Sequence, residues 1–588
     1  MNRRIKMMII GTLVIASLVT GCGNAKSSST STQQQVSTST QNTNKGLSGI
    51  VTYHSDDYYT QWSKEQVSTI SLEKDSIKYT GEGAVVNGST ITIKSAGTYL
   101  VSGTLKDGQI IIEANKEDTV RLILNGTEVN SSKSSPLYVK SAKKVILSLE
   151  KDTTNTFVDG SNYVLEDQSS DEPNSTIYSK DDLSINGTGT LIVKGNYNNA
   201  LTSKDDLKIV EGNINITSVD DGIMGRDLVA IKEGNINIEA KGDGIKVTND
   251  TEANKGVVAI EGGKINISKS YEGIEGFAIY VAGGETHIKS DDDGINIAGE
   301  SGMGGRGNKE PVNNNTTEAK TETSSEVSTQ TTDSRKLTIS GGYIVVDAKG
   351  DGLDANGAIE MTGGTVLVYG PTNNGNGSLD YDRTFNITGG VLVTAGSSGM
   401  AQAPTDTSSQ YSIMMTYSSS QKANTIVRLE DSDGKEIITL APTKDFQSLV
   451  ISSPKLEKGK KYNLYTGGTS SQSVVDGLYK EGSYNKAGDG VTFSVSNSVT
   501  YLSEEGVTTG KPGNMQGGGM KPKEGINNEN GTKPEGMIPS QDGSKPEKGS
   551  KPEDGTKTKK EKKTESDSSS SSGTSNDKAA KSTDETKN

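Results

Sequence analysis

A short motif recurs through the middle of the chain and leaves few folds open to it. Each copy starts with Gly, alternates apolar and polar residues, crosses a polar stretch, and usually ends on an acidic residue, Gly, and Ile or Leu. The opening glycines recur roughly every 22 residues, with one gap of 58. A second strand-like run, such as DLKIV or VVAIE, precedes each of them. The clearest copies are GTLIVKGNYNNAL (189–201), GNINITSVDDGI (212–223), GNINIEAKGDGI (234–245), GKINISKSYEGI (263–274), GETHIKSDDDGI (284–295) and GYIVVDAKGDGL (342–353).

This period predicts an all-β solenoid, a parallel β-helix with about 22 residues per coil. Two or three strands per repeat are too few for a propeller blade, helical spacing is missing, and the Leu frame of a leucine-rich repeat is absent. Strand alternation then points Asn215, Asn237 and His287 outward, which predicts a surface role for His287. The expected inward column contains Ile214, Ile236, Ile265 and Ile344.

Acidic residues recur at equivalent positions in the turn that closes each copy of the motif. The position before the turn glycine holds Asn199, Asp221, Asp243, Glu272, Asp293 and Asp351, the residue before it adds Asp220 and Asp292, and the position three residues later holds Glu275, Asn296, Asp354 and Asp380. Adjacent coils rise by about 4.8 Å. Two carboxylates at that spacing repel by roughly 3 to 4 kcal/mol at an effective dielectric near 20, so a column of them needs a cation.

Calcium suits this column because it takes several oxygen ligands at about 2.3–2.6 Å, close to half the coil spacing. Magnesium is smaller and keeps its waters, and no thiolate or His pair invites zinc. Asp-Gly also occurs as plain turn chemistry, and that alternative stays open for any single copy. The predicted calcium ligands are Asp220, Asp221, Asp243, Glu272, Glu275, Asp292, Asp293, Asp351, Asp354 and Asp380.

Composition excludes several function classes. A net charge of −14 argues against nucleic acid, which needs a basic surface. The single cysteine excludes an intramolecular disulfide and a Cys-based zinc site, and the two histidines are far apart in sequence. That cysteine, Cys22, follows a basic start, a short apolar run and LVTG, which resembles a bacterial lipobox. We therefore expect a lipidated Cys22 on the extracellular face of the bacterial membrane.

The domain organisation follows from these patterns. We expect a lipoprotein signal peptide at 1–22, a Ser/Thr/Gln-rich linker at 23–48, a β-helix at 49–410 with a disordered insertion at 300–335, a small C-terminal β region at 411–506, and a disordered tail rich in Lys, Pro, Gly and Ser at 507–588. Within the β-helix, residues 68–150 are expected to form the first coils and an N-terminal cap.

The DDGI and GDGLDANG turns, the SGG joints and the run GPTNNGNGSLDYDRTFNITGG (370–390), followed by GSSGMAQAP (396–404), resemble the clostridial surface carbohydrate-binding domain proteins. The resemblance covers about 49–505. It implies a right-handed parallel β-helix similar to pectate lyases, bound calcium, and binding of plant polysaccharides, either cellulose-like or polygalacturonate, without an established lyase activity. The acidic insertion and the lysine-rich tail depart from that pattern.

Three functions are compatible with these features. The first is a monomeric, calcium-stabilised carbohydrate-binding protein of the cell surface, with Tyr271, Tyr343, Tyr369 and Tyr381 as candidate sugar-binding residues near the acidic turns. The second is a calcium-dependent polysaccharide lyase. The third is an adhesin or structural spacer.

The lyase hypothesis needs a Lys or Arg base with a depressed pKa beside the cation. Lys246 and Arg226 lie near acidic turns in the sequence. Charged residues beside a carboxylate column are more often plain salt partners, so the sequence favours binding without an assigned catalytic residue.

Overall fold

The computed structural model describes residues 47–167, 169–252, 254–298, 335–480 and 482–509. All of the described residues belong to one compact unit of the chain. The expected signal peptide with Cys22, the linker up to residue 46, the insertion from 300 to 334 and the tail from 510 lie outside the described residues.

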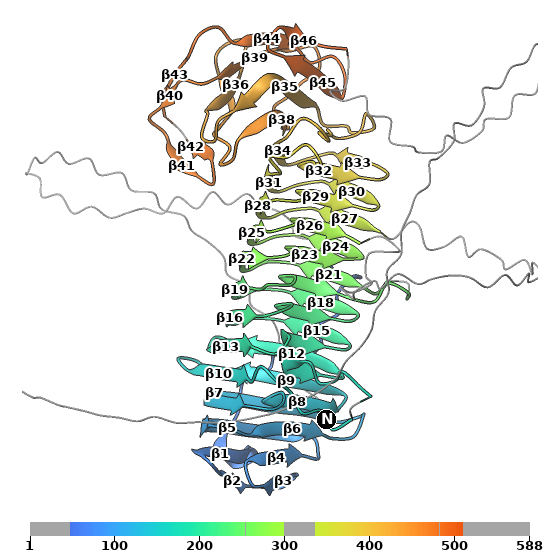
Figure 1. The fold of residues 1–588 in the computed structure, drawn as a ribbon, viewed down its shortest axis with the longest axis vertical. Helices are drawn as coiled ribbons and strands as arrows, with labels where there is room; N and C mark the ends of the chain where they lie inside the picture. Colours follow the sequence, from blue (N-terminus) through green and yellow to red (C-terminus); the bar gives the residue numbers. More distant parts are fainter. Residues whose placement is uncertain (1–46, 168, 253, 299–334, 481, 510–588) are drawn as a thin grey trace, which may run out of the picture. The chain divides into compact units, whose positions relative to one another are not determined.

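Parallel strands stacked coil upon coil make up most of the fold (Figure 1). The part of the chain that the structure describes contains no α-helix, only the short 3-10 helices η1 (Ser55–Tyr58) and η2 (Lys64–Gln66). Each strand of a coil pairs in parallel with the strand three places further along the chain, as when β16 (Asn213–Ser218) pairs with β19 (Asn235–Glu239). The predicted all-β repeat is therefore confirmed.

Three series of strands run through the coils. The first series, in the 26-stranded sheet, contains β9 (Lys144–Leu149), β12 (Asp182–Gly187), β15 (Asp206–Ile209), β18 (Leu228–Ile231), β21 (Val257–Ile260), β24 (Ala278–Val281), β27 (Lys336–Ile339), β30 (Ala358–Met361) and β33 (Phe385–Ile387). The second series, in the same sheet, contains β10 (Thr154–Asp159), β13 (Thr190–Gly195), β16, β19, β22 (Lys264–Ser270), β25 (Glu285–Ser290), β28 (Tyr343–Ala348), β31 (Thr365–Tyr369) and β34 (Val391–Gly396). The third series, in the 12-stranded sheet, contains β8 (Leu137–Ser141), β11 (Ser175–Ser179), β14 (Asn199–Ser203), β17 (Ile223–Gly225), β20 (Ile245–Val247), β23 (Ile274–Gly276), β26 (Ile295–Ile297), β29 (Leu353–Ala355) and β32 (Leu379–Tyr381).

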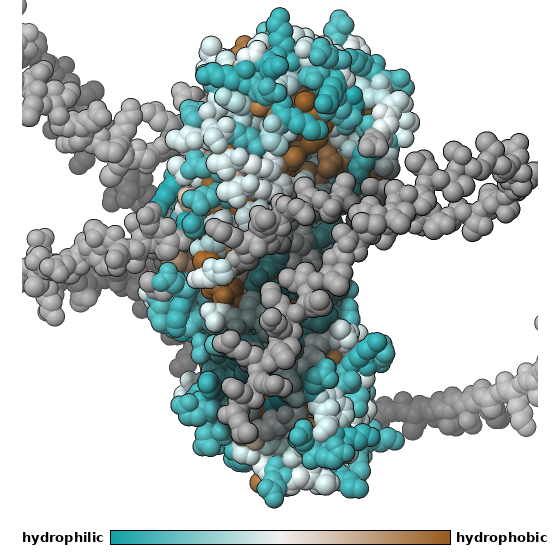
Figure 2. Space-filling model, turned by 180° about the vertical axis from the view of Figure 1, so that it is seen from behind, coloured by the Kyte–Doolittle hydropathy of each residue, from teal (hydrophilic) through white to brown (hydrophobic). Residues whose placement is uncertain are grey.

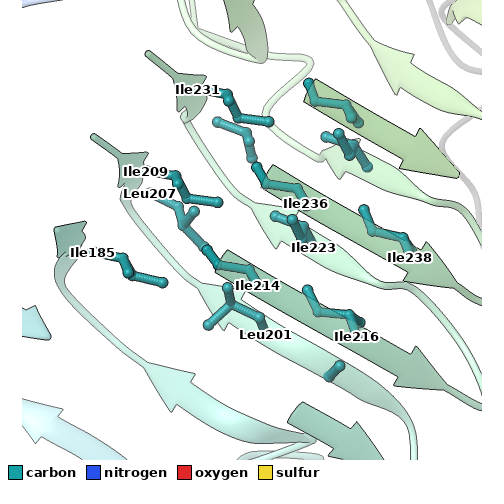
Figure 3. Packing of buried hydrophobic residues seen from close by; sticks show 14 of the residues in the cluster. Ile185, Leu201, Leu207, Ile209, Ile214, Ile216, Ile223, Ile231, Ile236 and Ile238 are labelled. Carbon is teal, nitrogen blue, oxygen red and sulfur yellow. The ribbon is translucent and has the colours of Figure 1, made fainter. Parts of the chain in front are cut away.

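The core is a set of aliphatic columns, one residue from each coil in each column. Figure 3 shows Ile214 and Ile216 stacked beneath Ile236 and Ile238, with Ile223 of the third series facing them. All are at most 3% exposed. Full burial of an aliphatic side chain stabilises a fold by about 1.5–3 kcal/mol, so the repetition of the column is the main source of stability here.

The N-terminal end is closed by antiparallel hairpins. β1 (Ser68–Lys74) pairs with β2 (Ile77–Thr80), and β3 (Ala84–Asn87) pairs with β4 (Thr90–Ile93). The coils begin where parallel pairing takes over, along β5 (Gly97–Leu105), β6 (Gln109–Glu113) and the long β7 (Thr119–Ser131).

At the other end the period stops but the sheet continues. β38 (Phe446–Ser452) pairs antiparallel with β34 and with β35 (Ser412–Gln421), so part of the C-terminal region extends the coil sheet. Most of its other strands form a separate six-stranded sheet. His287 points away from the coil core, yet it is only half-exposed because its Nε2 lies 3.0 Å from Oδ2 of Asp476 in this region. The remaining strands are β36 (Val427–Asp431), β37 (Glu436–Leu440), β39 (Lys461–Thr466), β40 (Thr469–Ser470), β41 (Ser473–Val475), β42 (Leu478–Lys480), β43 (Tyr484–Asn485), β44 (Val491–Ser494), β45 (Val499–Ser503) and β46 (Gly506–Val507).

The surface is largely polar. Figure 2 shows one face on which hydrophilic side chains dominate and hydrophobic ones gather only in small patches. Among the described residues, no helix has the length and apolar character needed to cross a membrane.

Candidate functional site: a two-column carboxylate ladder

The carboxylates predicted from the repeat lie in two columns beside the third strand series. Parallel pairing aligns Ile245 with Ile274, Ile274 with Ile295, and Leu353 with Leu379. The residue after each of these forms the second column, Lys246, Glu275, Asn296, Asp354 and Asp380. The register predicted from the sequence is therefore confirmed.

In the first column, each aspartate binds the backbone of the next coil, whereas Glu272 accepts a hydrogen bond from the side chain of Asn296 at 3.0 Å. Oδ1 of Asp221 accepts the N–H of Asp243 at 2.9 Å, and Oδ1 of Asp243 accepts the N–H of Glu272 at 3.0 Å. Further along, Oδ1 of Asp293 accepts the N–H of Asp351 at 2.6 Å. One oxygen of each aspartate thus has a structural role in the turn, and the other remains for a cation.

A glycine directly before the acidic position, such as Gly242 before Asp243, lets the carboxylates of the preceding coil approach. A Cβ on Gly242 would lie 2.5 Å from Oδ1 of Asp220 and 2.6 Å from Oδ1 of Asp221. Any other residue would push the acidic side chains aside. The glycine at this turn is therefore part of the ladder's geometry.

The lower end of the ladder already contains a cation. Carboxylate oxygens of Asp243, Glu272 and Glu275 converge within 4.8 Å of one another. Lys246 lies among them, with its Nζ 2.7 Å from Oδ2 of Asp243 and in an ion pair with Glu275. We refer to these four residues as the lower cluster.

Burial and the neighbouring charges shift the pKa values of the carboxyl groups in the lower cluster. Burial, followed by the charges of Glu275 and Asp243, raises the pKa of Glu272 to about 9. Burial also raises the pKa of Glu275 to about 7, although Lys246 acts against it. Burial, followed by the charge of Asp243, raises the pKa of Asp221 in the preceding coil to about 7. Lys246 thus offsets part of the negative charge of the lower cluster, through its ion pairs with Asp243 and Glu275.

The upper end consists of Asp293, Asp351, Asp354 and Asp380, the upper group. Burial, then neighbouring carboxylates, raises the pKa of Asp354 to about 8; burial also raises that of Asp293 to about 7 and that of Asp351 to about 6. Burial raises the pKa of Asp380 too, against a hydrogen bond from Nε2 of Gln402 at 2.7 Å. Within the described residues, no lysine or arginine forms an ion pair with any member of the upper group.

The remaining predicted ligands, Asp220 and Asp292, lie half-buried beside the first column. Asp291, one residue earlier, is different: it is exposed and pairs with Lys349. The run Asp291–Asp293 therefore divides into a neutralised surface aspartate and two that face the ladder.

Lys246 and Arg226, the candidate bases of the lyase hypothesis, have raised pKa values, whereas a catalytic base needs a lowered one. The pKa of Lys246 is raised, because the carboxylates of Asp243 and Glu275 outweigh its burial. The pKa of Arg226 is raised by its hydrogen bond to Glu252, and it also pairs with Asp227 at 2.8 Å. A base must lose its proton readily, so both residues act as salt partners here.

The four tyrosines occupy different environments. Tyr369 is 1% exposed and its hydroxyl donates to the carbonyl of Asp476, so its ring is a core element with no face open to a sugar. Tyr343 donates to Oδ2 of Asp476 at 3.0 Å, and Tyr381 donates to the carbonyl of Ala403 at 2.6 Å. Tyr271 is half-buried next to Glu272. The structure does not bring the four rings together into one surface.

One further acidic group was not predicted from the sequence. Asp182, Asp205 and Asp206 offer oxygens within 4.8 Å of one another, at the start of β12 and β15. Burial and the two neighbouring charges raise the pKa of Asp205 to about 6, and Lys208 pairs with Asp206 at 2.9 Å. The repeated KDDL at 180–183 and 204–207 was the signal that could have revealed it.

A family model described as "Carbohydrate-binding domain-containing protein" matches residues 87–375. A protein of Acetivibrio thermocellus with the same description is 42% identical over 194 residues, which are 33% of this chain and 68% of that protein.

A solved structure, the polysaccharide lyase-like protein from C. thermocellum in a gadolinium derivative, aligns with 26% identity. The alignment covers 55% of this chain and 96% of that one. Its TM-score of 0.36 is too low to establish a shared fold.

Proposed function

Because this chain belongs to the family of carbohydrate-binding domain-containing proteins, we propose that it is a calcium-stabilised protein that binds extracellular polysaccharide. In this proposal the stacked coils form a right-handed parallel β-helix and the ladder holds the calcium. Lipidation at Cys22, after cleavage of the signal peptide before it, anchors the protein as a monomer on the extracellular face of the membrane. The ligand class is plant-type polysaccharide, either polygalacturonate or a cellulose-like chain.

The observation that carries the calcium proposal is the uncompensated upper group. Its four carboxylates are half-buried, raise one another's pKa, and have no cationic partner among the described residues. A hard cation with oxygen ligands fits this donor set better than a thiophilic metal. Asp293, Asp351, Asp354 and Asp380 are the residues that would hold it.

The lower cluster fits an ion less well. Lys246 already supplies a positive charge between Asp243 and Glu275, so a calcium ion there would have to displace a buried ammonium group. Of the ten ligands predicted from the sequence, we therefore assign calcium to the upper group and leave Asp243, Glu272 and Glu275 to the lysine. When bound, calcium would supply charge neutralisation and a bridge between adjacent coils.

The test compares Asp293→Asn with Asp291→Asn as a matched control. Asparagine keeps the Oδ1 acceptor that binds the Asp351 N–H but removes the charge. Calcium that binds only the folded state stabilises wild type by about 2.7 kcal/mol at a hundredfold excess over Kd. We expect Asp293→Asn to lose most of that gain and Asp291→Asn to keep it, in thermal melts with EDTA, magnesium or calcium. Equal calcium responses in all three proteins would contradict the proposal.

Polysaccharide binding is measured separately by affinity electrophoresis in gels containing polygalacturonate or hydroxyethylcellulose. Retardation of the full chain in at least one gel is expected, without growth of the ultraviolet absorbance that marks an unsaturated lyase product. Unretarded migration in both gels would favour a spacer.

A further inference from the structure

A groove lies on the outer side of the coils, away from the carboxylate ladder. Two adjoining hollows of about 530 and 480 Å³ share Thr188 and Glu211 in their walls. Their floor is built from the turns that connect the first and second strand series, at residues 148–151, 187–188, 210–213 and 232–235. The groove therefore follows the direction in which the coils stack and crosses four consecutive coils.

One wall of the groove comes from residues 47–66, the N-terminal segment. Four aromatic residues fall within ten positions of it, Tyr53, Tyr58, Tyr59 and Trp62, in a chain with 5% aromatic residues overall. Tyr58 lines the first hollow and is 44% exposed, and Trp62, the only tryptophan of the protein, lines the second. Tyr58 and Trp62 therefore line the surface of the groove, whereas Tyr53 packs against the hydrophobic cluster around Val51.

The N-terminal segment is held in place by buried polar contacts. Asp57 is fully buried, binds Nζ of Lys144 at 2.9 Å, and accepts a hydrogen bond from Oγ of Ser184 at 2.6 Å. Arg121 donates to the carbonyl of Gln61 at 2.9 Å, and its guanidinium lies 4.4 Å from the ring centroid of Tyr59. These contacts fix the aromatic residues relative to the coils before any ligand arrives.

The polar lining suits a hydroxyl-rich chain without charge of its own. Asn213 and Asn235 supply amide donors and acceptors, and Nε1 of Trp62 donates to Glu150 at 2.7 Å. Three glutamates, Glu150, Glu211 and Glu233, face two lysines, Lys151 and Lys232. Nζ of Lys232 is already engaged with the rings of Tyr53 and Tyr58. The excess of carboxylate disfavours a polyuronate, whose every residue is anionic.

We propose that this groove binds an uncharged polysaccharide chain, with Tyr58 and Trp62 stacking on its sugar rings and the glutamates and asparagines hydrogen-bonding its hydroxyls. This rests on the proposed carbohydrate-binding function and assigns it a site. Tyr58 and Trp62 both precede residue 87, where the family match begins, so the site depends on residues outside that match. Aromatic rings offer large rigid faces at low entropic cost, which suits stacking on an extended ligand.

The sole tryptophan gives a direct readout. The full chain is titrated with cellohexaose, mannohexaose, xylohexaose and hexagalacturonate while Trp62 fluorescence is followed. We expect a saturable change with at least one uncharged hexasaccharide and none with hexagalacturonate. A change with hexagalacturonate alone, or with none of the four, would overturn the proposal.

Calorimetry with the uncharged hexasaccharide that responds then compares Tyr58→Ala and Trp62→Ala with Tyr479→Ala, a tyrosine of β42. We expect each groove variant to weaken binding about tenfold or more and Tyr479→Ala to leave it unchanged, with unfolding curves confirming that all three fold. If wild type is retarded by a polysaccharide gel and both groove variants bind as wild type does, the groove proposal fails while carbohydrate binding stands. If wild type binds no polysaccharide, both proposals fail.

Discussion

At the scale of single residues, the ladder shows that position in a column does not fix chemistry. Lys246 occupies the same register position as Glu275 and Asp354, yet it neutralises its neighbours where they add charge. The positive charge of Lys246 therefore offsets part of the negative charge of the lower cluster, whereas the upper group contains no such lysine. Two parts of one column can therefore depend on different cations.

Replacing Lys246 by Met should expose this difference. The variant leaves the buried carboxylates of Asp243 and Glu275 without a cation, and breaking a buried pair in this way costs about 3 kcal/mol or more. We expect that loss in denaturant unfolding with EDTA, and partial recovery with calcium, because the vacated position then suits an ion. Lys241→Met, an exposed lysine in the same turn, is the control and should change stability by less than about 0.5 kcal/mol. Equal stability of the two variants would show that Lys246 is not the compensating charge.

At the scale of elements, the N-terminal segment is one of the parts of the described chain that lie outside the repeat. It contributes no strand to a coil, but Val51 packs against Leu228, Val257 and Ala278, which lie in three successive coils. Burial acts to raise the pKa of Asp57, but the hydrogen bonds from Ser184, the His54 N–H and Lys144 outweigh it and lower that pKa. The buried pair of Asp57 and Lys144 therefore acts as the segment's anchor.

Asp57→Ala should release the segment from the coils. The neighbouring Asp56, also an ion-pair partner of Lys144 at 3.2 Å but 41% exposed, supplies the matched control. We expect Asp57→Ala to cost about 3 kcal/mol or more in stability and to increase acrylamide quenching of Trp62, while Asp56→Ala changes both only slightly. Unchanged quenching in Asp57→Ala would mean that the aromatic contacts alone hold the segment.

At the scale of the whole molecule, the raised pKa values predict how stability depends on pH. The folded-state values are about 7 for Asp221 and Asp293, about 8 for Asp354 and about 9 for Glu272, against ordinary values near 4. Between these limits the folded chain binds more protons than the unfolded chain, so its stability falls as pH rises. We expect unfolding in EDTA to become easier from about pH 5 to about pH 8. Calcium should flatten the curve by replacing the protons, and a pH-independent midpoint in EDTA would contradict the shifted carboxylates.

Membrane attachment is a prediction for the complete chain. If Cys22 is the lipidated N-terminus, Cys22→Ser should move the protein from the detergent phase of a Triton X-114 extraction of expressing bacteria to the aqueous phase and the medium. The control is Thr20→Ser, which keeps the cysteine and a small residue two positions before it. Identical partitioning of wild type and Cys22→Ser would exclude a lipid anchor at this residue.

What the sequence determined by itself is everything that repeats. A period of about 22 residues fixes which residues lie one coil apart, so the inward isoleucine columns and both carboxylate columns could be read from spacing alone. Strand alternation determined which side chains point inward and which point outward, because side chains two positions apart on a strand share a face. The sequence also placed Lys246 near the acidic turns, but it did not distinguish a salt partner of the carboxylates from a catalytic base.

Only the tertiary structure decided the contacts that have no period. Asp57 meets Lys144 across 87 residues and His287 meets Asp476 across 189, and no spacing rule relates either pair. The burial that moves the carboxylate pKa values likewise depends on how closely the coils approach at the turn glycines, which a sequence pattern does not measure. Periodic contacts are encoded locally, whereas docking of a single segment depends on the surface that the finished coils present.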